Sequence, residues 1–159
     1  MVKAFIEMVM HSRYKYELDK DSNTLLLDRP LNQAIPANYG FISNSLAPDN
    51  DPLDIFVITK FPLTPGTICK VNVMGIMKCT DNGTQDDKII ATLEGENMIA
   101  HWSRELESIE KYLKTYKEGF EYIIYSNESD AMQEIKICQK AFHDQELLNS
   151  LNKLSNPIY

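Results

Sequence analysis

The hydrophobic pattern divides the chain into a strand-rich first part and a helical last part. Up to about residue 100, short apolar or alternating runs are separated by turn-forming residues, which is typical of strands. The predicted strands cover residues 2–10, 15–19, 24–28, 53–59, 67–80 and 88–93. The second and third of these flank the turn-like sequence DKDSN, so we expect them to form a hairpin.

The apolar period then lengthens from two residues to between three and four. From residue 103, apolar positions recur at helical spacing until Gly119, which is a typical residue just after a helix end. A strand over residues 120–125 and a second helix beginning at Ser129 or Asp130 follow. The apolar positions of this second helix include Met132, Ile135, Cys138, Phe142 and Leu148. The pattern predicts a mainly β fold of the α+β class, in which two helices pack outside a small closed barrel.

Length and charge narrow the possible functions. The 159 residues suit one domain, which we expect to span residues 1–159. The formal net charge of -7 argues against a general nucleic-acid binder, because that class presents basic surfaces. The same charge is compatible with an anionic substrate, provided that cations lie between the acidic side chains and the substrate.

The cysteines and the apolar runs indicate a cytoplasmic location. Cys69, Cys79 and Cys138 are odd in number and form no CxxC pair, which favours neither a zinc site nor a disulfide framework. Free thiols fit a reducing compartment. The first residues contain no long apolar run typical of a signal peptide, and no stretch approaches the roughly 20 apolar residues of a membrane span. We expect a cytoplasmic protein that acts without a membrane.

The most informative segment is an acidic run at residues 49–55, which reads DNDPLDI. Pro52 stiffens the turn between the carboxylates of Asp49, Asp51 and Asp54. Solvated acidic loops are common, and a surface loop would explain the first two carboxylates. Asp54, however, lies at the start of an apolar strand, where an unpaired charge is costly, so its position favours a cation partner.

A second acidic cluster lies between two predicted strands. It contains Asp81 and Asp86, and Asp86 shares one face of an extended chain with Lys88. A carboxylate beside an ammonium on one face is either a surface ion pair or a metal ligand next to a phosphate-binding cation.

Further charged residues come from the predicted hairpin and from the end of the first helix. Hairpin pairing would bring Arg29 close to Lys15 and Glu17, and Lys117 follows the first helix. Many carboxylates with several cations indicate hard divalent ions that bridge to an anionic substrate. All-oxygen ligands favour Mg²⁺ or Mn²⁺ over zinc.

Two stretches resemble a known family. Residues 49–55 resemble the D-x-D-P-x-D signature of family I soluble inorganic pyrophosphatases, and residues 36–42, PANYGFI, resemble the family's P-x-N-Y-G-(F/Y)-I stretch. Other residues fall in the family's order at similar spacing, and the resemblance covers roughly residues 4–125. These residues are Glu7, Lys15, Tyr16, Glu17, Asp28, Arg29, the segment from Asp81 to Lys88, Tyr116 and Lys117.

The resemblance implies a role for each matched residue. The metal ligands would be Asp49, Asp54, Asp81, Asp86 and Glu17. Asp51 is similar to the residue proposed as general base, and together with Asp54 it would form the catalytic pair. Pyrophosphate would be bound by Lys15, Arg29, Tyr39, Lys88, Tyr116 and Lys117.

The resemblance also implies the activity, the cofactor and the assembly. It predicts hydrolysis of inorganic pyrophosphate to two orthophosphates, with several Mg²⁺ ions per active site and Mn²⁺ as a possible substitute. The implied fold is a five-stranded OB-like barrel with two helices. Short bacterial members of the family assemble as homohexamers, so we expect a homo-oligomer of that kind, with no nucleic-acid partner.

Three departures from the family pattern leave an alternative open. Ile35 stands where the family usually has a tyrosine, the interval from Arg29 to Pro36 is about two residues short, and residues 8–12 replace a stretch of the type I-P-x-G-S. The alternative is a catalytically impaired family member that acts as a structural or regulatory partner. An OB-like nucleic-acid-binding module is a second, weaker alternative, because the net charge is acidic.

Overall fold

The structure, a computed structural model, describes residues 1–97 and 102–155. Over these residues the chain is mainly β with two helices, as the hydrophobic pattern predicts. The strands are β1 (Val2–Met8), β2 (Tyr14–Asp19), β3 (Thr24–Pro30), β4 (Asn38–Ile42), β5 (Asp54–Ile58), β6 (Ile68–Asp81), β7 (Thr84–Gln85), β8 (Lys88–Leu93) and β9 (Phe120–Asn127). The helices are α1 (Trp102–Lys114) and α2 (Glu128–Ser155).

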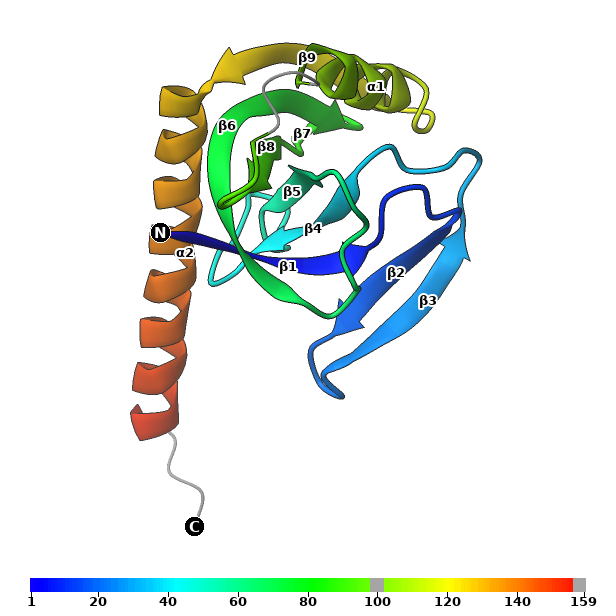
Figure 1. The fold of residues 1–159 in the computed structure, drawn as a ribbon. Helices are drawn as coiled ribbons and strands as arrows, with labels where there is room; N and C mark the ends of the chain where they lie inside the picture. The colour runs from blue at the N-terminus through cyan, green and yellow to red at the C-terminus, as the bar shows by residue number, and fades with distance from the viewer. Residues whose placement is uncertain (98–101, 156–159) are drawn as a thin grey trace.

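Within the described residues, five strands close into a ring (Figure 1). The path runs β1–β4–β5–β8–β6, and it closes because β6 also pairs with β1, with Val2 opposite Val71. The long strand β6 bends around the ring, so its beginning pairs with β1, its middle with β8 and its end with β9. A closed ring leaves no free edge in that part of the sheet, and it confirms the predicted small barrel.

The predicted hairpin is present as a separate two-stranded sheet outside the ring (Figure 1). Strands β2 and β3 pair from Asp19 opposite Thr24 to Tyr14 opposite Pro30. The carboxylate of Asp19 accepts a hydrogen bond from the backbone N–H of Ser22 at 3.0 Å, which stabilises the tight turn. Most of β3 is exposed to solvent, so the hairpin is packed on one side only.

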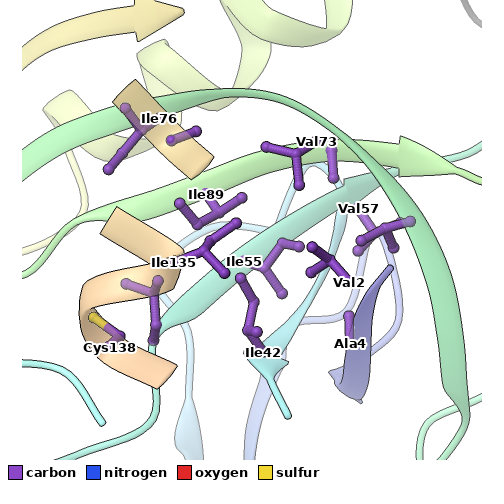
Figure 2. Packing of buried hydrophobic residues seen from close by; sticks show 14 of the residues in the cluster. Val2, Ala4, Ile42, Ile55, Val57, Val73, Ile76, Ile89, Ile135 and Cys138 are labelled. Carbon is purple, nitrogen blue, oxygen red and sulfur yellow. The ribbon is translucent and has the colours of Figure 1, made fainter. Parts of the chain in front are cut away.

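Buried side chains form two hydrophobic clusters on opposite faces of the barrel strands. Ile55 and Val57 of β5 point into the first cluster, which Ile135 and Cys138 of α2 complete (Figure 2). Phe56, between them, points into the second cluster, which includes the buried face of α1. Because both faces of β5 are covered, its sequence reads as a continuous apolar run rather than an alternating one.

Strand β4 is a feature that the hydrophobic pattern does not predict, because Pro36 lies shortly before it and Gly40 lies within it. Gly40 is required by a close approach to β1, since a Cβ atom there would lie 1.8 Å from the carbonyl oxygen of Phe5. The fully buried Asn38 donates to the carbonyl of Val57 at 3.0 Å and to the hydroxyl of Thr59 at 2.8 Å. These bonds hold β4 against β5.

Helix α2 extends farther than its contacts with the barrel. Ala131, Ile135 and Cys138 are buried, but all residues from 143 to 155 are exposed as the helix runs past the barrel (Figure 1). Leu148, one of the apolar positions named from the sequence, lies in this exposed part of the helix. Neither helix in the described part of the chain is long and apolar enough to cross a membrane.

Candidate functional site

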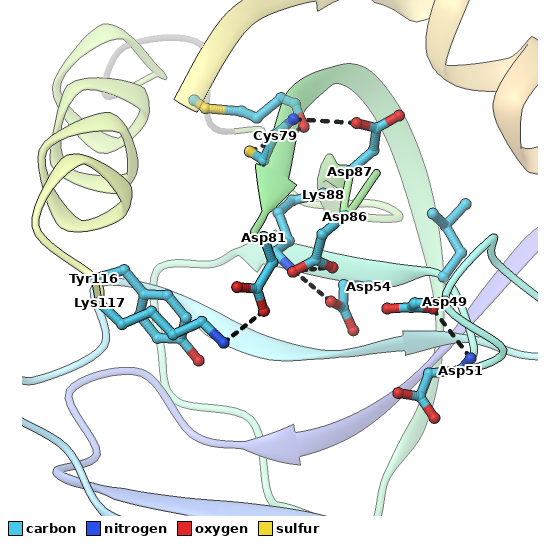
Figure 3. A network of polar contacts seen from close by, with 12 residues as sticks. Asp49, Asp51, Asp54, Cys79, Asp81, Asp86, Asp87, Lys88, Tyr116 and Lys117 are labelled. Atoms are coloured by element: carbon cyan, nitrogen blue, oxygen red, sulfur yellow. Dashed lines mark hydrogen bonds and ion pairs between the residues drawn. The ribbon is translucent and has the colours of Figure 1, made fainter. Parts of the chain in front are cut away.

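Most of the charged residues named from the sequence line one pocket of about 300 Å³ at the rim of the barrel. Figure 3 shows Asp49, Asp51, Asp54, Asp81, Asp86, Lys88 and Lys117 among them. Among the described residues, seven carboxylates and four lysines line this pocket. Eleven of the twelve predicted site residues are part of this lining: Lys15, Glu17, Tyr39, Asp49, Asp51, Asp54, Asp81, Asp86, Lys88, Tyr116 and Lys117. The remaining one, Arg29, lies beside the pocket and donates from Nη2 to the hydroxyl of Tyr116 at 3.3 Å.

Two neighbouring strands begin at the floor of the pocket. Strands β5 and β8 are parallel, and their register places Asp54 directly beside Lys88 at the first residue of each strand. Asp86 comes two residues before Lys88, where this ladder begins, so it lies on the same face as Lys88. Asp87 points the other way and accepts hydrogen bonds from the backbone N–H of Cys79 and the amide of Gln85. The sequence prediction that Asp86 and Lys88 share a face is confirmed.

Lys88 is the electrostatic centre of the pocket floor. Its Nζ lies 2.5 Å from Oδ2 of Asp54 and 2.7 Å from Oδ1 of Asp86, and its side chain is only 5% exposed. Burial alone would lower the pKa of Lys88, but the two carboxylates outweigh it and raise the pKa above its ordinary value. The ammonium also lies within 6 Å of the ring centres of Tyr39 and Phe120. Lys88 therefore acts as an internal counter-ion that holds Asp54 and Asp86 together.

The loop between β4 and β5 presents the remaining carboxylates of the acidic run. The carboxylate of Asp49 accepts the backbone N–H of Asp51 at 3.1 Å, and Asn50 adopts a left-handed conformation with φ of 69°. This tight turn directs Asp49 and Asp51 toward the pocket (Figure 3). Burial raises the pKa of Asp49, and the neighbouring charges of Asp51 and Asp86 act in the same direction.

Asp81 and Lys117 form an ion pair in another wall of the pocket. Asp81 is the last residue of β6, and its Oδ2 lies 2.6 Å from Nζ of Lys117. Lys117 lies in the turn between α1 and β9, as does Tyr116, whose ring packs against Tyr112 and Phe120. The turn therefore brings one cation and one hydroxyl into the pocket.

The hairpin supplies the outer wall. Lys15 is directly opposite Arg29 in the β2–β3 ladder, and its Nζ lies 2.7 Å from Oε1 of Glu17 and 3.6 Å from Oδ2 of Asp28. Burial acts to lower the pKa of Lys15, but the hydrogen bond to Glu17 and the neighbouring negative charges raise it overall. The predicted proximity of Lys15, Glu17 and Arg29 is therefore present in the structure.

Glu7 is a member of the pocket whose function the sequence alone does not indicate. It lies on the outward face of β1, and its Oε2 accepts the backbone N–H of Leu18 at 2.8 Å. Burial under the hairpin raises the pKa of Glu7 to about 7, and the charges of Asp54 and Glu17 act in the same direction. Alternation along β1 assigns Glu7 to a solvent-facing side, and only the position of the hairpin reveals that this side is covered.

Ile35, which departs from the family pattern, lies in the hydrophobic core behind the pocket. Its side chain is 2% exposed and borders a cavity of about 20 Å³. Lys15, Tyr39 and Lys88 line both this cavity and the charged pocket. Burial raises the pKa of Tyr39 well above its ordinary value, so this tyrosine presents a neutral hydroxyl. The aliphatic residue at position 35 therefore offers no polar group behind the pocket, whereas the charged residues of the pocket are present.

The donor set of the pocket suits hard divalent cations. Carboxylate oxygens from Asp49, Asp54, Asp81 and Asp86 line one hollow, and oxygen ligands are those that Mg²⁺ and Mn²⁺ prefer. Among the described residues no three acidic, histidine or cysteine side chains are already arranged around a common ion position. The ammonium of Lys88 lies between Asp54 and Asp86 and balances the charge of these two carboxylates.

A larger hollow of about 1030 Å³ lies elsewhere in the described part of the chain, and it is a weaker candidate. Its walls include Val71, Met74, Trp102 and Met132, and the charged side chains that line it are Glu96 and Glu128. Because chemistry on an anion requires convergent charged groups, the smaller acidic pocket is the better candidate for an active site.

Comparison with known proteins finds a matching family model and several relatives that are described as inorganic pyrophosphatases. A family model described as inorganic pyrophosphatase matches residues 4–150. An inorganic pyrophosphatase of Campylobacter jejuni is 32% identical over 154 residues, which cover 88% of this chain and 89% of the relative. Inorganic pyrophosphatase 1 of Pseudomonas syringae is 48% identical over 83 residues, which cover 51% of this chain and 47% of the relative. The chain thus matches about half of that relative's length, and 58% of a soluble inorganic pyrophosphatase of Zea mays.

Solved structures agree with the sequence comparison. An inorganic pyrophosphatase from Thermus thermophilus has a TM-score of 0.82 at 29% identity and covers 89% of this chain and 90% of that one. An inorganic pyrophosphatase from Helicobacter pylori has a TM-score of 0.81 at 29% identity and covers 89% of this chain and 92% of that one. The similarity therefore extends over the barrel that carries the charged pocket.

Proposed function

Because this chain belongs to the inorganic pyrophosphatase family, we propose that it hydrolyses inorganic pyrophosphate to two orthophosphates, with Mg²⁺ as its cofactor. The observation that carries the proposal is the convergence of eleven predicted site residues, distant in sequence, on one pocket of about 300 Å³. The comparisons give no support to the alternative of a catalytically impaired partner protein.

The acidic side of the pocket would hold the cofactor. Asp49, Asp54 and Asp86 would bind a first cation, with Asp54 shared by a second, and Mn²⁺ has the same ligand preference. Asp81 and Glu17 would bind cations that accompany the substrate. A divalent ion at this position would lower the pKa of a coordinated water and neutralise charge on the phosphate oxygens.

Asp51 would orient the attacking water and accept its proton. It lies on the same tight turn as Asp49 and lines the pocket without an ion pair in the described residues, so its carboxylate is free to accept a hydrogen bond. A base is effective only within hydrogen-bond reach of the proton that it removes, and the turn directs Asp51 into the pocket where the substrate would lie.

Cationic residues would stabilise the charge that develops on the leaving phosphate. Lys88 is bonded to Asp54 and Asp86, and divalent cations on these carboxylates would make its ammonium available to a phosphate oxygen. Lys15 and Lys117 reach the pocket from two other walls, and Arg29 offers a planar fork suited to phosphate. Phosphoryl transfer depends mainly on such positioning and charge neutralisation.

A phosphate-release assay on the purified protein tests the proposal. We expect rapid release from pyrophosphate in the presence of Mg²⁺, little release from ATP, and loss of activity when EDTA removes the cation. Release from ATP at a comparable rate would contradict the proposed substrate, and no release from pyrophosphate would favour the impaired-partner alternative.

The assembly and the location rest on the family resemblance. We propose a homohexamer in the cytoplasm, which sedimentation velocity on the purified chain and localisation of a tagged chain would test. A monomer at micromolar concentration would contradict the proposed assembly.

A further inference from the structure

The turn that follows α1 carries two of the substrate-side groups but has little regular structure of its own. Helix α1 ends at Lys114 and β9 begins at Phe120, so Tyr116 and Lys117 lie between them. The backbone of this turn is held by local bonds such as that from the N–H of Phe120 to the carbonyl of Lys117 at 3.3 Å. These bonds shape the turn, but they do not fix its position relative to the hairpin side of the pocket.

Gln33 connects the loop after the hairpin with the end of α1. It lies in the loop after β3, four residues beyond Arg29, and its Nε2 donates to the hydroxyl of Thr115 at 2.8 Å. The same nitrogen lies 3.4 Å from two carbonyl oxygens, that of Tyr112 in the last turn of α1 and that of Thr115 directly after the helix. A side chain from the loop after Arg29 thus caps the helix end that leads into Tyr116 and Lys117.

Two other side-chain polar contacts connect this turn with the site, and both involve groups that the proposed function assigns to ligands. Nη2 of Arg29 donates to the hydroxyl of Tyr116 at 3.3 Å, and the proposal assigns both residues to pyrophosphate. Lys117 is paired with Asp81 at 2.6 Å, and the proposal assigns Asp81 to a cation and Lys117 to a phosphate. Binding of both ligands would therefore weaken this ion pair. The bonds of Gln33 go to backbone carbonyls and to a threonine hydroxyl, which have no ligand to bind, so these bonds can persist in the loaded site.

We propose that Gln33 is a positioning residue that holds Tyr116 and Lys117 at the correct distance from Arg29 and the rest of the substrate site. The inference rests on the proposed function for its effect on pyrophosphate. Gln33 acts through the end of α1 and does not line the pocket in the described part of the structure.

The test compares Gln33→Met, which keeps the length of the side chain and removes its donor, with Asn32→Met as a matched control. Asn32 is the exposed neighbour in the same loop, and its side chain makes no hydrogen bond among the described residues. We expect Gln33→Met to raise KM for pyrophosphate about three- to tenfold with kcat within about twofold, and Asn32→Met to change neither.

A double-mutant cycle separates positioning from a general structural role. Gln33→Met is expected to add less than about twofold to the loss caused by Lys117→Ala, because both changes remove the same contribution, and to multiply with Lys15→Ala on the other wall. An unchanged KM in Gln33→Met, or full multiplication with Lys117→Ala, would overturn the inference.

Amide hydrogen exchange gives a readout that does not depend on activity. Gln33→Met is expected to speed exchange severalfold at the amides of Thr115, Tyr116 and Phe120, compared with Asn32→Met. Equal exchange in the two variants would overturn the inference even if the wild type is active. An inactive wild type with this exchange difference would contradict the proposed function and leave the positioning contact supported.

Discussion

The barrel rim and the outer hairpin face the same pocket, but they hold their charges in different ways. At the rim, Lys88 is 5% exposed and its partners Asp54 and Asp86 are 25% and 17% exposed. On the hairpin, the side chains of Glu17 and Arg29 are 57% and 43% exposed. Coulombic interactions are several times stronger where water is excluded. An ion pair at the rim therefore has a larger interaction energy than an ion pair of the same groups on the hairpin.

The difference has a structural origin. The rim carboxylates sit at the ends of strands that are hydrogen-bonded on both sides and buried on both faces, whereas β3 pairs only with β2 in the described residues. A site that must organise several divalent ions benefits from fixed ligands, and a site that must admit a substrate benefits from an accessible wall. We therefore expect changes at the rim to affect both folding and catalysis, and changes on the hairpin to affect substrate affinity alone.

The largest effect is expected from Asp54→Asn at the rim. The change keeps the size of the side chain but removes a charge that the proposal assigns to two cations, so pyrophosphate hydrolysis should fall on the order of a thousandfold or more. Mg²⁺ affinity, measured by calorimetric titration, should fall as well, while the circular dichroism spectrum stays unchanged. Asp21→Asn, at the exposed hairpin turn, is the control, and near-normal turnover in Asp54→Asn would refute its assignment.

Lys88→Met should destabilise the protein strongly when no divalent cation is present. Removal of the buried ammonium leaves two neighbouring carboxylates uncompensated, and breaking such a pair costs about 3–5 kcal/mol of unfolding free energy. Urea unfolding should show this loss in EDTA and a substantial recovery in Mg²⁺, because a bound cation replaces the missing charge. The exposed Lys78→Met serves as control. Destabilisation that Mg²⁺ does not relieve would argue against a cation position between Asp54 and Asp86.

Arg29→Ala probes the hairpin side. A charge-assisted hydrogen bond to phosphate contributes about 1.5–3 kcal/mol, so KM for pyrophosphate should rise about ten- to a hundredfold. Stability should change by less than about 0.5 kcal/mol, since the side chain is 43% exposed and its ion pair with Asp28 lies at the surface. Arg13→Ala provides a matched control on an exposed arginine at the base of the hairpin. A large loss of stability with unchanged KM would reverse the distinction between the two sides.

The smallest effect is expected at Glu7, where the hairpin covers the barrel. Its pKa is raised to about 7 in the folded protein from 4.5, so the folded state binds a proton more tightly than the unfolded chain does. Protonation therefore favours folding, and the protein should lose stability as the pH rises from about 4.5 to 7. Glu7→Gln should lack this loss and exceed the wild type by about 1–3 kcal/mol above pH 7, measured by urea unfolding in EDTA. Parallel stability profiles for the two proteins would show that Glu7 is not buried as described.

The sequence allows much of the rim to be predicted because its information is local. Asp49, Asp51 and Asp54 lie within six residues, and the alternation of Asp86 and Lys88 indicates a shared face. The turn between the two hairpin strands brings Lys15 close to Arg29, although a register shift between Lys15 and Tyr16 decides that Arg29 lies directly opposite Lys15. In each case the relevant spacing is set by one element or by one tight turn.

Features that depend on packing between distant elements cannot be predicted from the hydrophobic pattern of the sequence. Strand β4 contains a glycine that weakens its hydrophobic signal, and the reason for Gly40 lies in the backbone of Phe5. Glu7 looks solvent-facing until the hairpin covers it, and the contact of Gln33 with Thr115 spans 82 residues. The exposure of Leu148 likewise depends on where the barrel ends beneath α2.

A crystal structure with Mg²⁺ and a non-hydrolysable pyrophosphate analogue tests the central claim most directly. The account predicts ions coordinated by Asp49, Asp54 and Asp86, with Nζ of Lys88 moved from these carboxylates to a phosphate oxygen. If Lys88 still bridges Asp54 and Asp86, with no ion among the three aspartates, the proposed site would be contradicted.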